Sequence, residues 1–281
     1  MDTLIWIAAG LFLPLFPMSM VFNAVFQRLH NSWVRALLLL AWPLPGIWLL
    51  TNHSADLSAT AVPEWVMAWA LITAALYAFR GIVVREAGIW SGYVATSAWS
   101  LVWIAHGIAV TYEIESTAVL AQTMLLQAMT FSLPLVLMVM LVSELEKRYE
   151  SAYAGIVSGI AQAQPRLSGM LVMVTLAVIG SPVFPSFFSM LHNITGAIAA
   201  QPMLAAGTAV VWLMWSWSAI RLLQELLVGP ALVLRHESIG WQDMGLKDMG
   251  QNDMSKGEVF IYGALLVMLV VAGISITEVL V

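Results

Sequence analysis

Two histidines and an asparagine lie inside apolar stretches of the sequence, where they could exchange or guide protons. His106 lies deep in the stretch 88–112, and His192 and Asn193 are neighbours in the stretch 167–199. An imidazole gains and loses a proton near neutral pH, and an ionisable group at membrane depth commonly marks an ion path. These residues are candidates for a proton relay. The alternative is structural: a neutral imidazole or an amide that hydrogen-bonds to a neighbouring helix.

Arg221 and Glu225 extend the candidate relay toward the end of the stretch 203–228. Their spacing of four residues places them on one face of a helix, where they can form an ion pair. Long side chains near a helix end can also reach the membrane surface. A structural ion pair is therefore the alternative to a role in proton transfer.

Three tryptophans, Trp212, Trp215 and Trp217, also lie within the stretch 203–228. Trp212 and Trp215 share a helix face, and Trp217 points away from it. We expect this group to pack on a partner protein or on lipid rather than around a cofactor.

Other chemistry has little support in the sequence. The chain contains no cysteine, which excludes disulfides, thiolate metal sites and iron–sulfur clusters carried by this chain. There is no glycine-rich phosphate loop and no nucleophile elbow, and His236-Glu237 is not followed by a second histidine four residues later. We therefore expect no metal, no cofactor and no catalysis by this chain alone.

The elements that must position these residues are apolar stretches of membrane-spanning length. The composition is 61% hydrophobic and only 10% charged, whereas a soluble domain has about a quarter charged residues. Most of the eight stretches are long enough to cross about 30 Å of hydrocarbon as helices. They cover residues 3–25, 36–50, 64–79, 88–112, 117–143, 167–199, 203–228 and 258–280. The sequence therefore predicts an all-α integral membrane protein of about eight transmembrane helices.

The basic residues fall on one side of this predicted bundle. If the stretches alternate in direction, one face receives all eleven Lys and Arg residues: Arg28, Arg35, Arg80, Arg85, Lys147, Arg148, Arg166, Arg221, Arg235, Lys247 and Lys256. The opposite connections, 51–63, 113–116 and 200–202, contain none. The positive-inside rule then predicts a multi-pass protein of a bacterial-type inner (cytoplasmic) membrane with both termini outside. No basic stripe suggests a nucleic-acid partner. The first stretch follows Met1-Asp2 without a basic n-region, so we expect it to be a retained span.

The stretch 167–199 is too long for one straight crossing. Gly180, Ser181, Pro182 and Pro185 lie at its middle and disfavour a continuous helix. Two crossings would move the basic residues after it to the other face, so one crossing by a discontinuous helix is preferred. Non-helical backbone at membrane depth is tolerated only where protein or a wet cavity surrounds it.

Two other segments carry recognisable signals. The stretch 36–50 is short and interrupted by Pro43 and Pro45, so it either extends back to Asn31 or is kinked. The polar loop 229–257 repeats Asp-Met three times and ends in Ser255-Lys256-Gly257-Glu258, which is typical of a capping box.

From about residue 88 onward, several short motifs follow the order of a known family. They are Thr96-Ser97 with Gly107-Ile108, Gln127, Leu145-Glu146-Lys147-Arg148, Gly180-Ser181-Pro182 with Phe187, Pro202 with Gly229, and Asp253-Met254-Ser255-Lys256-Gly257-Glu258. In these motifs the chain resembles the antiporter-like membrane subunits of respiratory complex I, above all the M-type subunit. Related subunits occur in Mrp sodium/proton antiporters, membrane-bound hydrogenases and inorganic-carbon uptake complexes.

The resemblance implies a fold of fourteen helices with two inverted five-helix repeats, each containing one broken helix. This chain would keep about three N-terminal helices in residues 1–87 and the last five helices in residues 88–281. It would represent one half of the antiporter-like repeat fold.

The departures from the family pattern concern proton transfer. The resemblance implies a lysine or glutamate just after the helix break, and this register puts Met190 there. At two positions where the resemblance implies histidine, this chain has Phe131 and Ser100. At a position where it implies a basic residue, this chain has Glu225. Methionine and phenylalanine cannot exchange protons, so the usual path is dismantled.

Three functions remain open on this basis. The first is an accessory subunit that scaffolds or bridges other integral membrane subunits, such as full-length antiporter-like proteins, in an ion-translocating or redox-linked complex. The second is a conducting subunit with a rebuilt proton or cation path through His106 and His192. The third is a membrane anchor for a peripheral enzyme, such as an inorganic-carbon uptake or hydrogenase subunit, that docks on the loops 144–166 and 229–257.

Overall fold

A computed structural model describes residues 2–52, 62–111, 117–229 and 253–280, and these residues are mostly helical. The helices are α1 (Asp2–Phe12), α2 (Ser19–Arg28), α3 (Ser32–Ala41), α4 (Pro43–Asn52), α5 (Glu64–Val83), α6 (Ala87–Ser100), α7 (Val102–Thr111), α8 (Thr117–Tyr149), α9 (Ile160–Ala163), α10 (Pro165–Val178), α11 (Pro185–Ala200), α12 (Pro202–Leu227) and α14 (Lys256–Leu280). Five helical segments of the described residues are long and apolar enough to cross a membrane: Ser32–Asn52, Glu64–Val83, Ala118–Tyr149, Pro202–Leu227 and Lys256–Ser275. The chain is an all-α integral membrane protein.

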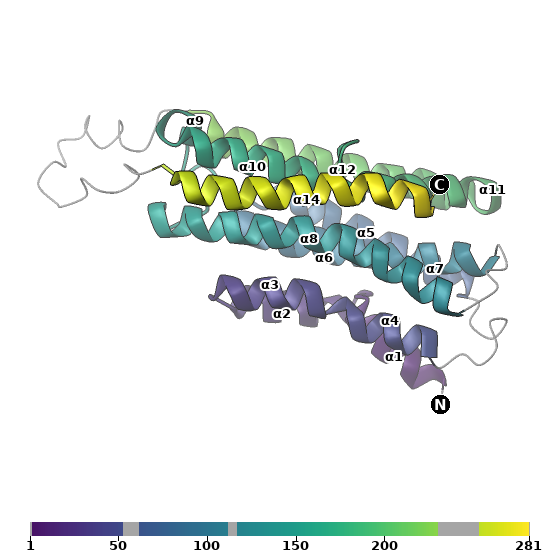
Figure 1. Ribbon diagram of the computed structural model, residues 1–281. Coiled ribbons are helices and arrows are strands. Elements are labelled where there is room, and N and C mark those ends of the chain that lie inside the picture. Colours follow the sequence, from purple (N-terminus) through teal and green to yellow (C-terminus); the bar gives the residue numbers. More distant parts are fainter. Residues whose placement is uncertain (1, 53–61, 112–116, 230–252, 281) are drawn as a thin grey trace, which may run out of the picture.

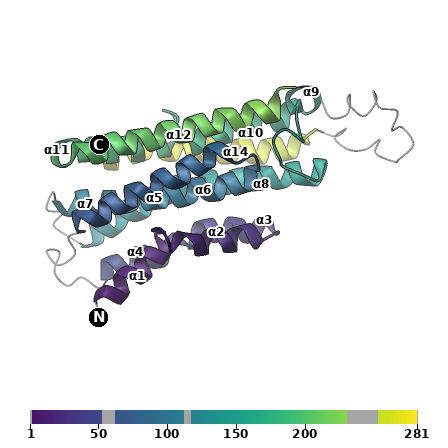
Figure 2. The ribbon, with the colours of Figure 1, turned by 180° about the vertical axis from the view of Figure 1, so that it is seen from behind.

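The helices run side by side along one axis and form three tiers. Helices α1 to α4 make the first tier, α5 to α8 the second, and α9 to α12 with α14 the third (Figures 1 and 2). The N-terminus and the C-terminus lie at the same end of the bundle (Figure 1).

The remaining three expected stretches are each built from two shorter helices. They are 3–25 (α1 and α2), 88–112 (α6 and α7) and 167–199 (α10 and α11). The first two of these are corrections, because the sequence predicted one uninterrupted span in each. In the first, Pro14 and Pro17 explain the interruption, since each removes a backbone donor that a continuing helix needs. In the second, only Leu101 separates α6 from α7.

The short stretch at 36–50 does extend back to Asn31. The side chain of Asn31 caps α3 by accepting a 2.9 Å hydrogen bond from the Trp33 backbone N–H. Only Trp42 separates α3 from α4, and Pro43 stands at the first position of α4, where its missing N–H costs little. The two helices therefore form one continuous crossing segment.

Small residues let the helices of different tiers approach closely. Gly107 of α7 packs against Met67 of α5, and Gly207 of α12 packs against Leu71 of α5. A Cβ added at Gly196 of α11 would lie 2.9 Å from Ile108 Cγ2 of α7. Such contacts replace the hydrophobic driving force that helices lack inside lipid.

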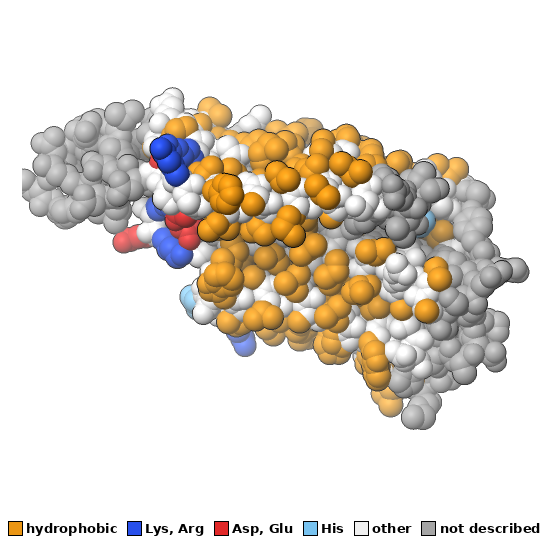
Figure 3. All heavy atoms as spheres, viewed as in Figure 1, with side chains coloured by type: hydrophobic (Ala, Val, Ile, Leu, Met, Phe, Trp, Pro, Cys, Tyr) orange, Lys and Arg blue, Asp and Glu red, His pale blue; other side chains and the backbone are white. Residues whose placement is uncertain are grey.

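On the face shown in Figure 3, the Lys and Arg side chains gather at one end of the bundle, called the charged end below, while hydrophobic side chains cover its length. Arg148 at the end of α8 lies 3.6 Å from Glu144 and 3.5 Å from Glu258 of α14. The predicted capping box is present: Ser255 N donates to Glu258 Oε2 at 2.6 Å, and Glu258 N donates to Ser255 Oγ at 3.2 Å. The first two Asp-Met repeats, at 243–244 and 248–249, lie outside the described residues.

Asp253, from the third Asp-Met repeat, caps a helix far away in the sequence. Its carboxylate accepts hydrogen bonds from the backbone N–H groups of Arg166 (2.9 Å) and Leu167 (3.2 Å) in the first turn of α10. Arg166 in turn donates from Nη1 to the Met254 carbonyl oxygen at 3.0 Å. An acidic side chain at a helix N-terminus satisfies free donors and complements the helix dipole, so this contact joins α10 to α14.

Candidate functional site

The interruption between α1 and α2, residues 13–18, is enclosed by hydrogen bonds from the helices around it. The indole N–H groups of Trp42, Trp103 and Trp69 donate to the carbonyl oxygens of Leu11 (3.2 Å), Leu13 (2.9 Å) and Phe16 (2.7 Å). Two hydroxyl groups add to this: Ser100 Oγ donates to the Pro14 carbonyl at 2.8 Å, and Thr73 Oγ1 accepts from the Phe16 N–H at 3.1 Å. These side chains supply partners that water cannot supply inside a membrane.

The interruption between α10 and α11, residues 179–184, has fewer such partners. Trp212 Nε1 of α12 donates to the Ile179 carbonyl at 2.6 Å, and Ser186 Oγ donates to the Ala177 carbonyl at 2.5 Å. Gly180 has φ +71°, a left-handed conformation that side-chain-bearing residues rarely adopt. Ser181 N donates to the Leu176 carbonyl at 3.0 Å, which closes the end of α10.

Part of this second interruption is exposed among the described residues. Pro182 is exposed and Val183 is 56% exposed, although the sequence led us to expect a shielded segment. On its inner side the segment contacts α14, where a Cβ added at Gly273 would lie 3.0 Å from Pro185 N and 3.1 Å from the Val183 carbonyl oxygen. Only glycine allows this approach of two backbones.

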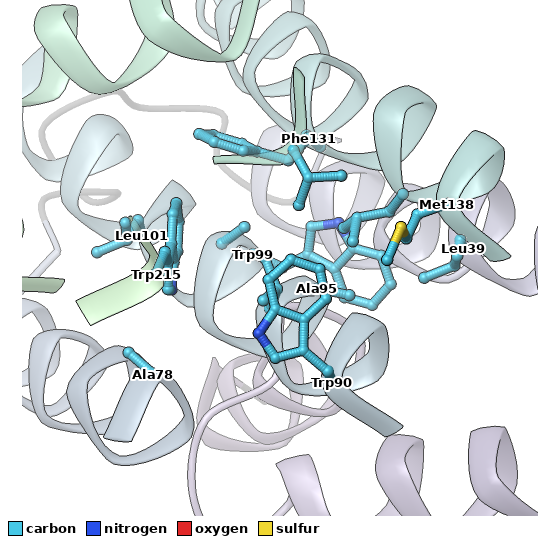
Figure 4. Close-up of a cluster of buried hydrophobic side chains, with 14 of the residues drawn as sticks. Leu39, Ala78, Trp90, Ala95, Trp99, Leu101, Phe131, Met138 and Trp215 are labelled. Atoms are coloured by element: carbon cyan, nitrogen blue, oxygen red, sulfur yellow. The ribbon is translucent and has the colours of Figure 1, made fainter. Parts of the chain in front are cut away.

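Met190, the residue at the expected position of a titratable group, is completely buried in α11. Beside it, Ser189 Oγ shares a 2.8 Å hydrogen bond with Thr130 Oγ1 of α8. Phe131 follows Thr130 and meets the ring of Trp215 edge-on at a centroid distance of 5.6 Å. Figure 4 shows both rings in the buried cluster with Trp99 and Trp90. Met190 itself belongs to the buried hydrophobic core of the chain.

Three buried polar side chains close to this region lack hydrogen-bond partners among the described residues. They are Asn193 on α11, through both Oδ1 and Nδ2, Gln127 on α8, through Nε2, and Thr208 on α12, through Oγ1. Asn193 and Thr208 are 0% exposed and Gln127 is 3% exposed. A buried polar group without a partner costs about 1–3 kcal/mol, so this region has unused hydrogen-bonding capacity.

The two candidate histidines lie on different helices and do not face a common space. His106 is buried on α7. Ile108, two residues later, is the side chain that packs on Gly196 of α11, and residues two apart on a helix face in different directions. His192 lies on α11 with its side chain partly exposed, whereas its neighbour Asn193 points into the bundle.

Arg221 and Glu225 form the ion pair that their spacing predicts, with Nε and Oε1 3.1 Å apart. The second oxygen of Glu225 lies 3.7 Å from Arg85 Nε, and Arg221 Nη1 donates to the Ile82 carbonyl at 3.0 Å. Arg221 therefore binds a carbonyl group in the last turn of α5, and Glu225 joins α12 to the connection between α5 and α6. These contacts support the structural alternative for this pair.

The tryptophans of α12 differ in burial and in their hydrogen bonds from what the sequence predicted. Trp215 is fully buried and donates from Nε1 to Ser97 Oγ at 3.0 Å. Trp212 donates to the Ile179 carbonyl at the second interruption. The expectation that this group packs on a partner or lipid is wrong for Trp212 and Trp215 and stays a prediction for Trp217, which is 68% exposed. Among the described residues, no group of three or more His, Cys, Asp or Glu side chains could hold a metal ion.

Sequence reasoning missed the residues that enclose the first interruption and the hydroxyl pair beside Met190. Trp103, Ser100 and Thr130 look like ordinary members of apolar helices. Their partners come from distant parts of the chain: Trp103 and Leu13 are 90 residues apart, and Thr130 and Ser189 are 59 apart. The one local signal was Pro14 with Pro17, which marked the place where carbonyl groups would need donors.

Comparison with known proteins gives a match in structure only. No protein-family model and no curated protein matches the sequence. A chain in the structure of respiratory complex I from Thermus thermophilus with bound NADH is similar, with 17% identity and a TM-score of 0.74 over 95% of this chain and 52% of that chain. A chain of the Mrp complex from Dietzia sp. gives 13% identity and a TM-score of 0.75 over 98% and 56%.

A third similar chain belongs to the membrane-bound sulfane sulfur reductase, an archaeal respiratory membrane complex, with 13% identity and a TM-score of 0.72 over 96% of this chain and 51% of that one. These matches cover more than residues 88–281, so the first 87 residues take part in the likeness. The chain spans about half the length of the solved chains it matches. The resemblance read from the sequence is thus confirmed at the level of fold: this chain has the fold of about half of a membrane subunit of the complex I and Mrp type.

Proposed function

We propose that this chain is an accessory membrane subunit of a multi-subunit ion-translocating or redox-linked complex, with a scaffolding or bridging role and a degenerate proton path. The observation that carries the proposal is Met190. In the register of the resemblance this position follows the helix break and holds a lysine or glutamate. Here the side chain cannot titrate, and it is fully buried in the hydrophobic core.

The arrangement of the other candidate relay residues supports the same role. A proton relay needs groups that exchange protons within hydrogen-bonding reach of each other or through water. His106 points away from the face of α7 that packs on α11, and His192 is partly exposed. Arg221 and Glu225 are engaged with Arg85 and the end of α5 at the charged end of the bundle.

For the topology we propose eight crossings, with residues 1–87 as a three-helix membrane segment and residues 88–281 as a five-helix segment of the antiporter-like type. The pairs α1–α2, α6–α7 and α10–α11 would each make one crossing, the last of them interrupted from Gly180 to Pro185. Two observations support an even number: both termini lie at one end, and the charged side chains gather at the other (Figures 1 and 3). The basic end would face the cytoplasm and both termini the outside of a bacterial-type inner membrane.

As partners we propose other integral membrane subunits, including full-length antiporter-like proteins. The similar chains are parts of multi-subunit membrane complexes, and they are about twice as long as this chain. A chain with one half of the fold has a face that a complete neighbour could cover. A peripheral subunit on the loops 144–166 and 229–257 is compatible with this arrangement.

The test is proton transfer by membrane vesicles that contain the complete complex, measured together with complex integrity on native gels. His106→Phe and His192→Phe are each expected to lose less than about tenfold in coupled activity, roughly 1.4 kcal/mol, with the loss following the amount of intact complex. Met190→Glu is expected to be silent or to impair assembly, because a lone buried carboxyl group stays protonated. A proton-transfer defect in a fully assembled His106→Phe complex would favour a conducting subunit instead.

A further inference from the structure

The three unsatisfied side chains Gln127, Asn193 and Thr208 belong to helices that meet in one part of the bundle. Helices α8 and α11 run in opposite directions (Figures 1 and 2), and the Thr130–Ser189 hydrogen bond fixes their register. Toward the end of the bundle at which the termini lie, Gln127 is one turn beyond Thr130 on α8, and Asn193 is one turn beyond Ser189 on α11. Each shares a helix face with the hydrogen-bonded residue of its own helix, because positions three or four apart are neighbours on a helix surface.

Thr208 reaches the same level from the third helix. Helices α11 and α12 are joined at Gln201 and are antiparallel. Asn193 stands eight residues before Gln201 and Thr208 seven residues after it, so with a rise of about 1.5 Å per residue the two lie at nearly equal depth. The buried face of α12 that carries Thr208 also carries Trp215, which contacts Phe131 of α8.

The chemistry of the unsatisfied atoms restricts what can bind them. Asn193 has both a free donor and a free acceptor, Gln127 has a free amide donor, and the Thr208 hydroxyl can act either way. Free amide donors disfavour a bare cation, and no charge is present on these three side chains to hold an anion. A small neutral molecule that donates and accepts hydrogen bonds satisfies all of them, and buried water typically makes two to four such bonds.

We propose that Gln127, Asn193 and Thr208 bind a small group of buried water molecules in the half of the bundle that lies away from the charged end. Toward the charged end the site is bounded by Met190 and by the Phe131–Trp215 ring pair. The water is a fixed part of the structure and does not continue through this aromatic and aliphatic layer. This site does not depend on the proposed function, since a scaffold and a conductor could both contain it.

The site can be tested by hydroxyl-radical labelling of the full-length chain in detergent or membranes with X-ray pulses. Radicals form from bound water and oxidise nearby side chains, and methionine is converted readily to its sulfoxide. Met190 lies three residues from Asn193 and is 0% exposed. Met138 on α8, in the cluster of Figure 4, is also 0% exposed and accepts a 4.0 Å hydrogen bond from the Thr175 hydroxyl. It lies eleven residues from Gln127, about 16 Å along the helix, so it is the matched control.

We expect Met190 to be oxidised severalfold faster than Met138. Asn193→Leu should reduce this difference, because it replaces the amide with an apolar group. Thr208→Val, which preserves shape and removes only the hydroxyl, should reduce it in a chain that folds normally. Equal, slow oxidation of Met190 and Met138 in the unmodified chain would overturn the proposal, as would oxidation of Met190 that neither variant changes.

Discussion

The two helix interruptions of this chain meet the same physical demand in different ways. Inside a membrane the carbonyl and amide groups released at a break have no water to bind. At residues 13–18 three tryptophans, a serine and a threonine from neighbouring helices supply the partners. At residues 179–184 the described side chains that do so are Trp212 of α12 and Ser186 at the start of α11, and Pro182 and Val183 are exposed.

The difference lies in how many side-chain donors and acceptors reach each helix break. The first interruption is held in place by hydrogen bonds from five side chains, although Pro17 within it is exposed. The second leads into the helix that carries Met190 and Asn193. The first is a packing feature, whereas the second has fewer side-chain partners among the described residues and an unsatisfied polar region beyond it.

The structure around the first interruption can be destabilised most directly by removing the buried indole of Trp103. Trp103 is fully buried, donates to the Leu13 carbonyl and stacks on Trp6 at 5.7 Å. Trp103→Ala is expected to lower the free energy of unfolding in detergent by about 3–5 kcal/mol, because it leaves a cavity and an unsatisfied carbonyl. Trp103→Phe, which keeps most of the ring, should cost less. A fully stable Trp103→Ala chain would contradict the enclosed character of this break.

The second interruption can be disturbed from the inner side through Gly273. A Cβ there would press on backbone atoms of residues 183–185, so Gly273→Ala is expected to lower the free energy of unfolding by about 1–3 kcal/mol. Gly169 on α10 is the matched control, because an added Cβ meets nothing within 4 Å. Gly169→Ala should be neutral or slightly stabilising, and the two variants can be compared in one denaturation series. Equal effects would show that α14 does not press on the break.

The hydrogen bond to the Ile179 carbonyl tests how much the second interruption depends on its few partners. Trp212→Phe keeps an aromatic ring beside Phe187 and removes the indole donor. We expect a loss of about 1 kcal/mol in the free energy of unfolding, smaller than for the buried Trp103. The comparison is Trp69→Phe, which removes the donor to Phe16 from a ring that is 42% exposed. A larger loss for Trp212→Phe than for Trp103→Ala would reverse the ranking of the two interruptions.

The smallest effect is expected at the charged end, away from both interruptions. Arg85 is about half exposed and lies 3.7 Å from Glu225, so Arg85→Gln should change the free energy of unfolding by less than about 1 kcal/mol. Arg221→Gln should cost more than Arg85→Gln, because Arg221 also serves the Ile82 carbonyl at the end of α5. Raising the salt concentration should reduce the Arg85 effect further. An Arg85→Gln loss as large as that of Trp103→Ala would be inconsistent with a surface pair.

Sequence reasoning was strongest where local chemistry decides the structure. Apolar length indicated the helices, Ser255 with Glu258 indicated a cap, Asn31 was one of two alternatives for the start of a short stretch, and the Arg221–Glu225 spacing indicated an ion pair. Gly180 and Pro182 marked residues at which a helix is difficult to continue. Pro14 and Pro17 carry the same signal, but the apolar run around them conceals it.

What the sequence could not provide depends on which helix faces meet. The donors to Leu13, Pro14 and Phe16 come from residues more than 50 positions away in the chain. The unsatisfied amide of Asn193 is visible only once its neighbours on α8 and α12 are known. The same limit applies to His106, because a histidine in an apolar helix carries no indication of the side to which it points.

The attachment of the last helix has a consequence for the order in which the molecule is completed. Only 17% of the most apolar part of α14 is buried, yet this helix carries contacts at both of its ends: Glu258 lies by Arg148 at one end, and Gly273 lies against the second interruption toward the other. Asp253, just before α14, caps α10. The first turn of α10 therefore lacks its cap, and residues 183–185 lack their inner cover, until α14 is in place.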